Sequence, residues 1–403
     1  MSGPLAGISV LELVQKGPGA FATMMLADMG ADVIKVETPA RTGESGSGGS
    51  AVDGNARAQA ANVANRGKRS IVLDLKDPDG QAVLHKLSKE AAVLVEGFRP
   101  GVTAKLAADY PTLRELNSSL VYCSLSGFGQ DGPYRNLPGH DINYIGMAGV
   151  LNLVGQLDGP PVVPPNLIAD YGGAALHAVS GIMMALFVRE RSGKGQYVDI
   201  SYLDSSLALM SATRAIRDYL ADGSDTERGS GTLGGSFPYY TVYDTRDGKY
   251  VTVACIEPWL WKNLCNALQR PDLIEAGMRA GPDSAVVSER QAWCRDQLAQ
   301  VFRSRDRDEW FELLKTANVC VGKVNNLPEV FADPQLRARG MILPLQHPEL
   351  GEVLQVGIAI KLSETPGQVR GFAPWKGEHS DEILASLGYG REDIAALRAR
   401  QVI

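Results

Sequence analysis

Apolar residues near the start of the chain alternate between short runs and stretches with helical spacing. The run "GISVLEL" (7–13) precedes the helix-like stretch "GAFATMMLADMG" (19–30), and a second run, "ADVIKVE", follows at 31–37. Short β-branched runs on either side of an amphipathic stretch predict a β-α-β unit. The pattern continues with a predicted helix at 79–91 and predicted strands at 92–98 and 120–129. This regular alternation predicts an α/β fold with a parallel sheet.

Two segments rich in glycine and serine interrupt the pattern. Residues 41–70 show no apolar period before "SIVLDL", and we expect a mobile loop that orders on a ligand. The stretch 165–190 carries a predicted long helix of small residues that begins after Asp170, followed by the turn "RSGKGQ" and the strand "YVDIS". The second glycine-rich segment, 221–236, marks a domain boundary. Beyond it, "YYTVYDTRDGKYVTVACIE" predicts a hairpin that turns at Asp247-Gly248 and opens a smaller α+β unit.

Composition narrows the classes of function. The chain has 403 residues, 44% of them hydrophobic and 21% charged, which is typical of a soluble globular protein. Its net charge of -6 argues against nucleic-acid binding, which requires basic surface. Five widely spaced cysteines without a C-x-x-C pair argue against a disulfide framework or a zinc site and favour a reducing cytoplasm. We expect no export signal and no apolar run long enough to cross a membrane.

Several catalytic classes are excluded by missing motifs. The sequence contains no G-x-S-x-G elbow, H-E-x-x-H pair or Walker loop. The segment "QKGPGAF" (15–21) lies between a predicted strand and helix, but it lacks the G-x-G-x-x-G pattern of nicotinamide sites. Of the catalytic classes considered, acid/base catalysis and nucleophilic catalysis by a carboxylate remain consistent with the sequence.

Three acidic residues and one histidine are candidates for that chemistry. His140 and Asp141 follow a proline and a glycine in "PGHDINY". Asp170 precedes the predicted long helix, and Glu257 ends a predicted strand before a proline. Each has an ordinary structural alternative, because aspartate is a common N-cap and His140 is equally consistent with a loop. Read locally, the structural alternative is favoured.

Basic residues gather in two short segments. "NRGKRS" contains Arg66, Lys68 and Arg69, while "FRPG" contributes Arg99, with Lys105 six positions later. Such clusters are usually solvated surfaces, but arginine and lysine also supply charge-assisted hydrogen bonds to phosphate groups.

The motifs in their order resemble those of the class III CoA-transferase superfamily (CaiB/BaiF type), which includes the α-methylacyl-CoA racemases. The similarity extends over nearly the whole chain, through "PLAGISVLEL", "NRGKRSIVLDLK", "LVEGFRPGV", "LSGFGQDGPY", "SGKGQYVDIS" and "GEHSDEILASLGY". The resemblance implies an interlaced homodimer with a Rossmann-like large domain built from both ends of the chain. It places the N-terminal part of the CoA-binding domain at 1–205, a linker at 206–225, the small domain at 226–335, and the return linker with the C-terminal part at 336–403.

The resemblance also assigns roles to residues. Transferases of the superfamily carry glutamine near Gly17 and commonly tyrosine in place of His140, whereas "GPG" and "GHDINY" are similar to the racemase branch. That branch implies His140 and Asp170 as an acid/base pair, supported by Asp141 and by Glu257 from the partner chain. Neither a metal nor a cofactor is expected beyond the coenzyme A of an acyl-CoA substrate. The predicted CoA contacts are Arg66, Lys68, Arg69, Leu73, Lys76, Arg99 and Lys105.

Two other functions stay open at this point. In a CoA-transferase, Asp170 would attack the thioester and carry CoA as an aspartyl thioester. A CoA-binding subunit without activity would use the same fold. The racemase interpretation fits the residues best, because removing and returning an α-proton on opposite faces requires two groups in opposite protonation states.

Overall fold

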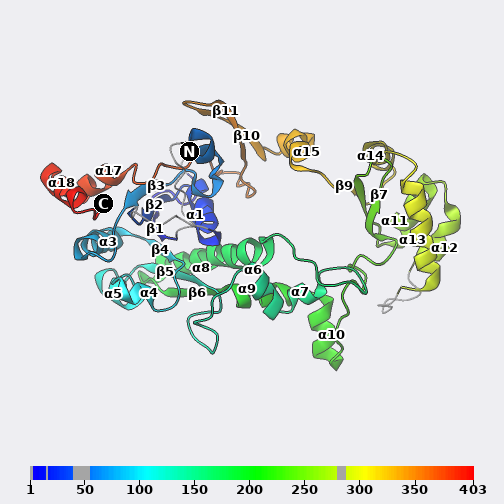
Figure 1. Cartoon of the computed structure of the whole chain (residues 1–403), viewed down its shortest axis with the longest axis horizontal. Coiled ribbons are helices and arrows are strands. Elements are labelled where there is room, and N and C mark those ends of the chain that lie inside the picture. Colours follow the sequence, from blue (N-terminus) through cyan, green and yellow to red (C-terminus); the bar gives the residue numbers. More distant parts are fainter. Residues whose placement is uncertain (1–2, 15–16, 40–54, 279–286) are drawn as a thin grey trace. The chain divides into compact units, whose positions relative to one another are not determined.

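A six-stranded parallel sheet organises the first of two structural units in the computed structural model, which describes residues 3–14, 17–39, 55–278 and 287–403 (Figure 1). Its strands are β1 (Ser9–Leu13), β2 (Asp32–Glu37), β3 (Arg69–Val72), β4 (Val93–Glu96), β5 (Val121–Ser126) and β6 (Tyr197–Ser201). They lie in the order β3-β2-β1-β4-β5-β6 with every neighbouring pair parallel. This confirms the predicted parallel α/β sheet. The order reverses between β1 and β4, where open α/β sheets bind ligands beyond the carboxyl ends of the strands.

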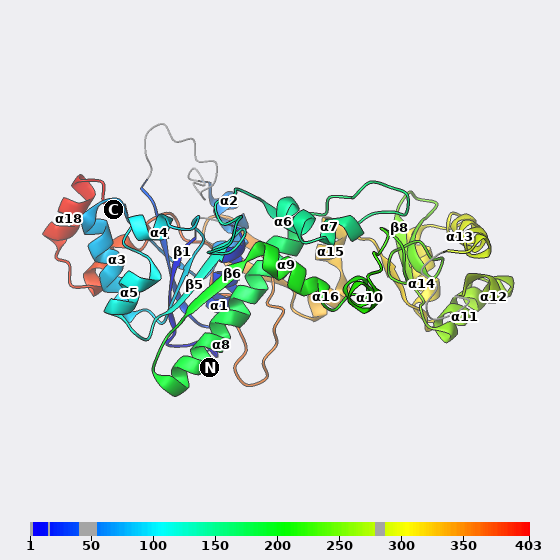
Figure 2. The ribbon, with the colours of Figure 1, turned by 90° about the horizontal axis from the view of Figure 1, so that it is seen from below.

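Apolar side chains fill both faces of this sheet. Along β1 the side chains alternate, so that Leu11 and Leu13 join one core while Val10 joins the other. The first core is covered by α3 (Pro78–Glu90) and α5 (Tyr110–Leu116), and the second by α1 (Pro18–Asp28) and α8 (Leu176–Ser192). Figure 2 shows α3 and α5 on one side of the strands and α8 on the other. Burial on both faces explains the nearly continuous apolar runs that predict these strands.

The remaining elements of the first unit connect or extend the sheet. They are α2 (Ala56–Ala61), η1 (Val63–Asn65), α4 (Val102–Lys105), α6 (Asp141–Met147), the π-helix η2 (Leu167–Ala175), α9 (Tyr202–Met210), α16 (Pro334–Ala338), β10 (Ile342–His347), β11 (Gly351–Val356), α17 (Ser380–Ser386) and α18 (Arg391–Ala399). Strands β10 and β11 form an antiparallel hairpin. The C-terminal helices belong to the first core, to which Ile383, Leu384 and Leu397 contribute. Both ends of the chain therefore build this unit.

The glycine-rich segment 41–70 differs from the predicted loop in the part that is described. Residues 55–70 form α2, η1 and the start of β3. Asn55 begins α2 by accepting the backbone N–H of Arg57 at 2.9 Å, which satisfies one free amide of the first turn. Residues 40–54 lie outside the described residues.

The second unit is a smaller α+β structure. Strands β7 (Tyr240–Asp244), β8 (Tyr250–Ala254) and β9 (Val321–Lys323) form an antiparallel sheet. Gly248, with φ of 72°, allows the β7–β8 turn that the sequence predicts. The helices are α7 (Val150–Leu153), α10 (Arg214–Asp222), α11 (Pro258–Ala267), η3 (Pro271–Leu273), α12 (Ile274–Gly277), α13 (Glu289–Phe302), α14 (Arg307–Leu314) and α15 (Leu327–Ala332).

Each of the two units is built from more than one segment of the chain. The second unit comprises 149–164 and 210–333, and the first contains the rest. Segment 149–164, which the sequence assigns to the large domain, therefore belongs to the second unit. The expected linker at 206–225 is largely helical, since α9 and α10 occupy most of it.

One helical stretch departs from the expectation about membranes. Residues Leu167–Ser192, which comprise η2 and α8, are long and apolar enough to cross a bilayer, so the expected absence of such a run is wrong by length and composition. One face of α8 nevertheless packs into the second core through Ala178, Ile182 and Ala185. Helices buried in soluble proteins pass the same test.

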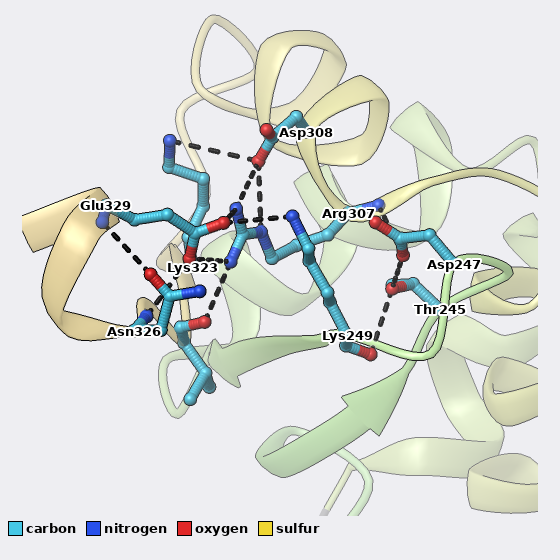
Figure 3. Close-up of polar contacts among 9 residues, drawn as sticks. Thr245, Asp247, Lys249, Arg307, Asp308, Lys323, Asn326 and Glu329 are labelled. Carbon is cyan, nitrogen blue, oxygen red and sulfur yellow. Dashed lines mark hydrogen bonds and ion pairs between the residues drawn. The ribbon is translucent and has the colours of Figure 1, made fainter. Parts of the chain in front are cut away.

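A buried arginine joins the small sheet to the segment that returns to the first unit (Figure 3). Arg307 is only 1% exposed and binds Glu329 of α15 through two N–H···O contacts of 2.8 and 2.7 Å. It also donates to the carbonyl oxygen of Val324 at 2.8 Å, while Lys249 reaches Glu329 at 2.9 Å. Arg307 and then Lys249 hold the pKa of Glu329 far below its ordinary value. The ion pairs fix α15 just before the chain leaves this unit at residue 333.

We expect Glu329→Gln to lower the melting temperature at pH 7, because the buried guanidinium then keeps only the exposed Asp308 as a counter-charge. Since the folded-state pKa is lowered, the stabilisation is present above about pH 4.3 and fades as acid protonates Glu329. Thermal melts between pH 3 and 8 measure the difference. Glu312→Gln, whose partner Lys315 is exposed, is the matched control and should change little.

Candidate active site

The carboxylate of Asp141 joins the two segments that carry the candidate residues. Asp141 is buried at the start of α6, and its Oδ2 accepts the backbone N–H groups of Ala169 at 2.8 Å and Asp170 at 3.0 Å. Both amides belong to the first turn of η2, where backbone donors have no partner within the helix. Asp141 therefore caps η2 and not its own helix, whose N-cap is His140. Its hydrogen bonds do not support the expected role of orienting the imidazole.

Asp170 presents a half-buried carboxyl group. Its Oδ2 accepts a hydrogen bond from the Asn166 side chain at 2.9 Å. Burial raises the pKa of Asp170 and the charge of Asp141 raises it further, whereas the Asn166 hydrogen bond and His140 lower it. A carboxyl group with a raised pKa exchanges protons closer to neutral pH. Sequence reasoning missed Asn166, although its position four residues before Asp170 in a helical segment was a usable signal.

His140 stands beside this carboxyl group. Its side chain is exposed, and its backbone N–H donates to Asn143 Oδ1 at 3.0 Å, which fixes the start of α6. The charge of His140 lowers the pKa of Asp170, against the larger effect of burial. The structure thus brings His140, Asp141 and Asp170 together where α6 meets η2.

The π-helical turns around Asp170 depend on glycine. A Cβ at Gly173 would lie 3.0 Å from the carbonyl oxygen of Ile168 and 3.3 Å from Cβ of Ser205 in α9. Glycine therefore permits the close approach of η2 to α9, and π-helical turns occur frequently at functional sites. Gly172 and Gly173 lie inside η2 and not in its first turn.

Aromatic rings back the cluster. Tyr144 of α6 stacks on Tyr202 with ring centroids 5.1 Å apart and meets Phe128 edge-on at 5.2 Å. A Cβ at Gly139 would lie 2.6 Å from the Tyr144 ring, so glycine before His140 gives the ring its space. Burial, then the charge of Asp170, raises the pKa of Tyr144 to about 12. Tyr144 is therefore protonated and uncharged at neutral pH.

Glu257 is placed in the second unit. It is exposed and forms the N-cap of α11, directly after the end of β8. His140, Asp141 and Asp170 belong to the first unit. Within the described residues, no group of three or more His, Cys, Asp or Glu side chains could hold a metal ion.

A cavity of about 230 Å³ lies at the carboxyl ends of β1, β2 and β3. Among the predicted CoA contacts, Leu73 and Lys76 line it, opposite Phe98 and Leu106. Arg99 follows Phe98, and Lys105 precedes Leu106, so both basic residues are neighbours of the cavity wall in the chain and are exposed. Two of the seven predicted contacts, Leu73 and Lys76, thus line this cavity, and two more, Arg99 and Lys105, are chain neighbours of lining residues.

Arg66 and Lys68 do not fit the predicted phosphate contact. Arg66 is 2% exposed and pairs with Asp28 at 2.6 Å, and it also donates to the carbonyl oxygen of Val356. Lys68 is 4% exposed and binds Glu12 at 2.7 Å. Burial, opposed by Glu12, lowers the pKa of Lys68 to about 8. Both cations are committed to buried carboxylates, since a buried charge requires a partner.

Arg69 also does not line the 230 Å³ cavity. It begins β3, at the amino edge of the sheet, and pairs with Asp32 at 2.5 Å and Glu382 at 3.2 Å. A separate cavity of about 550 Å³ at that edge includes Arg69, His347 and Trp375. The cluster "NRGKRS" thus divides into core and opposite-edge residues, which the local sequence could not show.

An open parallel sheet with a titratable cluster and a cavity at its carboxyl edge is the arrangement of an α/β enzyme. The sequence matches the model of CoA-transferase family III over residues 5–380. The chain therefore belongs to the class III CoA-transferase family of enzymes, as its motifs predict.

Similar proteins in this family carry two kinds of name. Human alpha-methylacyl-CoA racemase is 35% identical over 406 residues, covering 99% of this chain and 97% of the relative. The succinate–glutarate CoA-transferase of Agrobacterium fabrum is 34% identical over 396 residues, covering 95% and 96%. A crystal structure of a CaiB/BaiF family protein from Brucella suis superposes with a TM-score of 0.78 and 30% identity, covering 96% and 100%. Racemases and transferases are thus both represented.

We expect Arg66→Ala to lower the free energy of unfolding by about 3–5 kcal/mol, because Asp28 is left as an unpaired buried charge. CoA affinity of the folded variant should stay near that of the unchanged protein. Denaturant unfolding and calorimetric titration with CoA measure the two effects. A loss of CoA affinity at unchanged stability would restore Arg66 as a ligand contact.

Proposed function

We propose that this protein is a racemase or epimerase of 2-methylacyl-CoA thioesters. The observation that carries the proposal is that Asp141, which directly follows His140, binds the Asp170 backbone and so brings the two candidate residues to the α6–η2 junction, where Asn166 holds the Asp170 carboxyl group. The "GHDINY" sequence, similar to the racemase branch, and the 35% identity to human alpha-methylacyl-CoA racemase support it.

The chemistry follows from two groups in opposite protonation states. One group removes the proton on the α-carbon, and the other returns a proton to the opposite face. A neutral imidazole and a protonated carboxyl group, or imidazolium and carboxylate, serve the two directions. The raised pKa of Asp170 makes its protonated form accessible nearer to neutral pH. The thioester itself acidifies the α-proton, so we propose no cofactor beyond the CoA of the substrate.

The cavity at the carboxyl edge is the proposed binding site for the nucleotide part of CoA. Lys76 lines the cavity, and Arg99 and Lys105 directly adjoin lining residues in the chain, so positive charge is available beside a lining that is mainly apolar but also contains Glu37 and Asp74. Charged side chains at exposed positions suit phosphate groups that remain partly hydrated. We further propose that Glu257 acts from the small domain of a partner chain and that the protein is cytoplasmic.

Incubation with a 2-methylacyl-CoA in deuterated water should exchange the α-proton. We expect His140→Ala and Asp170→Ala each to reduce exchange by at least about a hundredfold, the usual contribution of a positioned acid or base. Mass spectrometry of the thioester measures exchange, and titration with CoA checks that the variants still bind.

CoA transfer is the second candidate, because the names of similar transferases and the half-buried Asp170 carboxylate favour it. Transfer would proceed through an aspartyl thioester on Asp170. Hydroxylamine trapping of an Asp170 adduct during turnover, with no α-proton exchange, would overturn the racemase proposal. A protein that binds CoA and does neither would be a binding subunit.

The hydrogen bond from Asn166 should tune the pH profile. Asn166→Ala removes a donor to the Asp170 carboxylate and so raises the pKa of Asp170 further. When Asp170 is the base, activity falls as the pH drops through this pKa, and the acidic limb of kcat/KM should move to higher pH. An unmoved acidic limb would show that this limb does not report Asp170.

The exposed face of α8 is the proposed contact with a second copy of the chain. Met184 and Phe187 are 68% and 65% exposed, beside Met183 and Val188. Apolar patches of this kind mark interaction surfaces, and the family resemblance implies an interlaced homodimer.

We expect the double variant Met184→Lys, Phe187→Lys to shift a dimer toward monomer in light scattering after size exclusion. Leu116→Lys on α5, an exposed apolar residue outside the patch, is the control and should leave the dimer intact. A monomeric unchanged protein that partitions into lipid vesicles would instead favour a membrane contact for this helix.

A further inference from the structure

Glu96 is a buried carboxyl group that the proposed chemistry does not use. It is 3% exposed at the end of β4, the strand beside the point where the sheet order reverses (Figure 1). No ion pair observed in the described residues includes it. Its partners are uncharged: Oε2 accepts the backbone N–H of Phe98 at 2.8 Å, and Oε1 accepts the hydroxyl of Ser124. Ser124 in turn accepts the hydroxyl of Tyr197 at 2.9 Å.

Core packing alone gives no reason for a carboxyl group here. Burial raises the pKa of Glu96 to about 7, opposed by the Ser124 and Phe98 hydrogen bonds. Burying an ionisable group without a counter-charge is unfavourable, and an apolar side chain of similar volume would be tolerated at least as well. The contact with the Phe98 amide distinguishes Glu96 from a space-filling residue, because it acts on the backbone of a turn.

That turn forms one wall of the cavity. Phe98 lines the cavity together with Val102 and Leu106. After Phe98 the chain bends sharply: the N–H of Val102 donates to the carbonyl oxygen of Arg99 at 3.1 Å, and Gly101, with φ of 84°, leads into α4. The carboxyl group of Glu96 fixes the first amide of this bend. The position of Arg99, one residue further on, depends on the same anchor.

Arg99 directly follows Phe98 and is exposed. Its charge lowers the pKa of Tyr144 of α6, against the larger effect of burial. The backbone at Phe98 thus determines both the apolar wall of the cavity and the direction of the neighbouring cation.

We propose that Glu96 is a positioning residue for CoA, which holds the Phe98–Arg99 turn in the conformation that receives the nucleotide part of the ligand. This inference rests on the proposed function, which places CoA in this cavity. Glu96 acts through the backbone of the turn and does not itself contact the ligand.

Two substitutions separate the anchor from the volume of the side chain. Glu96→Gln keeps a carbonyl oxygen for the Phe98 amide and an N–H₂ group for Ser124. Glu96→Met fills a similar volume without an acceptor. Ser124→Ala is the matched control, because it removes the other core hydrogen bond of Glu96 and leaves the Phe98 contact in place. Each purified full-length variant is titrated with CoA by calorimetry, and its melting temperature is recorded.

We expect Glu96→Met to weaken CoA binding by about tenfold, because Phe98 and Arg99 must then be ordered by the ligand. Glu96→Gln and Ser124→Ala should bind CoA within about threefold of the affinity of the unchanged protein, because one weak hydrogen bond contributes about this much to the free energy. Folded Glu96→Met with unchanged affinity, or Ser124→Ala as weak as Glu96→Met, would overturn the inference. Failure of the unchanged protein to bind CoA would instead refute the proposed function, and with it the ligand assigned to Glu96.

Discussion

The site depends on the two hydrogen bonds that the Asp141 carboxylate accepts from the first turn of η2. A buried carboxylate needs donors, and the opening turn of a helix has backbone amides without partners. Each satisfies the other at 2.8 and 3.0 Å, and the contact joins residues 28 and 29 positions apart in the chain. These hydrogen bonds join the start of α6, where His140 lies, to the turn of η2 that carries Asp170. The negative charge of Asp141 also raises the pKa of Asp170. One carboxylate therefore both fixes the backbone of the site and changes its electrostatics.

The parallel sheet decides where polar chemistry can occur in the first unit. Because helices cover both faces, polar groups are either paired in the core or gathered at the strand ends. Lys68 with Glu12 and Arg66 with Asp28 are the paired kind. Lys76, Arg99 and Lys105 lie at or near the carboxyl edge, around the cavity, and Glu96 ends its strand there to hold one wall. These basic residues of the first unit thus fall into two groups: those that neutralise buried carboxylates and those that are exposed near the strand ends.

Proton transfer and acyl transfer demand similar things of Asp170. A base needs a raised pKa and an approach to the substrate carbon, and a nucleophile needs an exposed oxygen near the thioester. A half-buried carboxyl group with a raised pKa, held by the side-chain amide of Asn166, is compatible with either role. The two chemistries differ in their need for a second proton carrier. His140 at the start of α6 is the candidate for that carrier in the proposed racemisation, whereas acyl transfer through Asp170 needs none.

The sequence by itself determined the alternation of strands and helices, the hairpin at Asp247-Gly248, the family, and the pairing of His140 with Asp170 as candidates. The elements and the hairpin follow from local periodicity and turn residues, which a linear chain displays directly, whereas His140 and Asp170 became a candidate pair only through the family resemblance of the motifs. Tertiary structure alone decided that Asp141 caps η2, that Asn166 holds Asp170, and that Arg66 and Lys68 belong to the core. Capping partners and counter-charges come from segments distant in the chain, so no local pattern specifies them. For the same reason, a local pattern of basic residues does not show whether they bind phosphate or neutralise buried carboxylates.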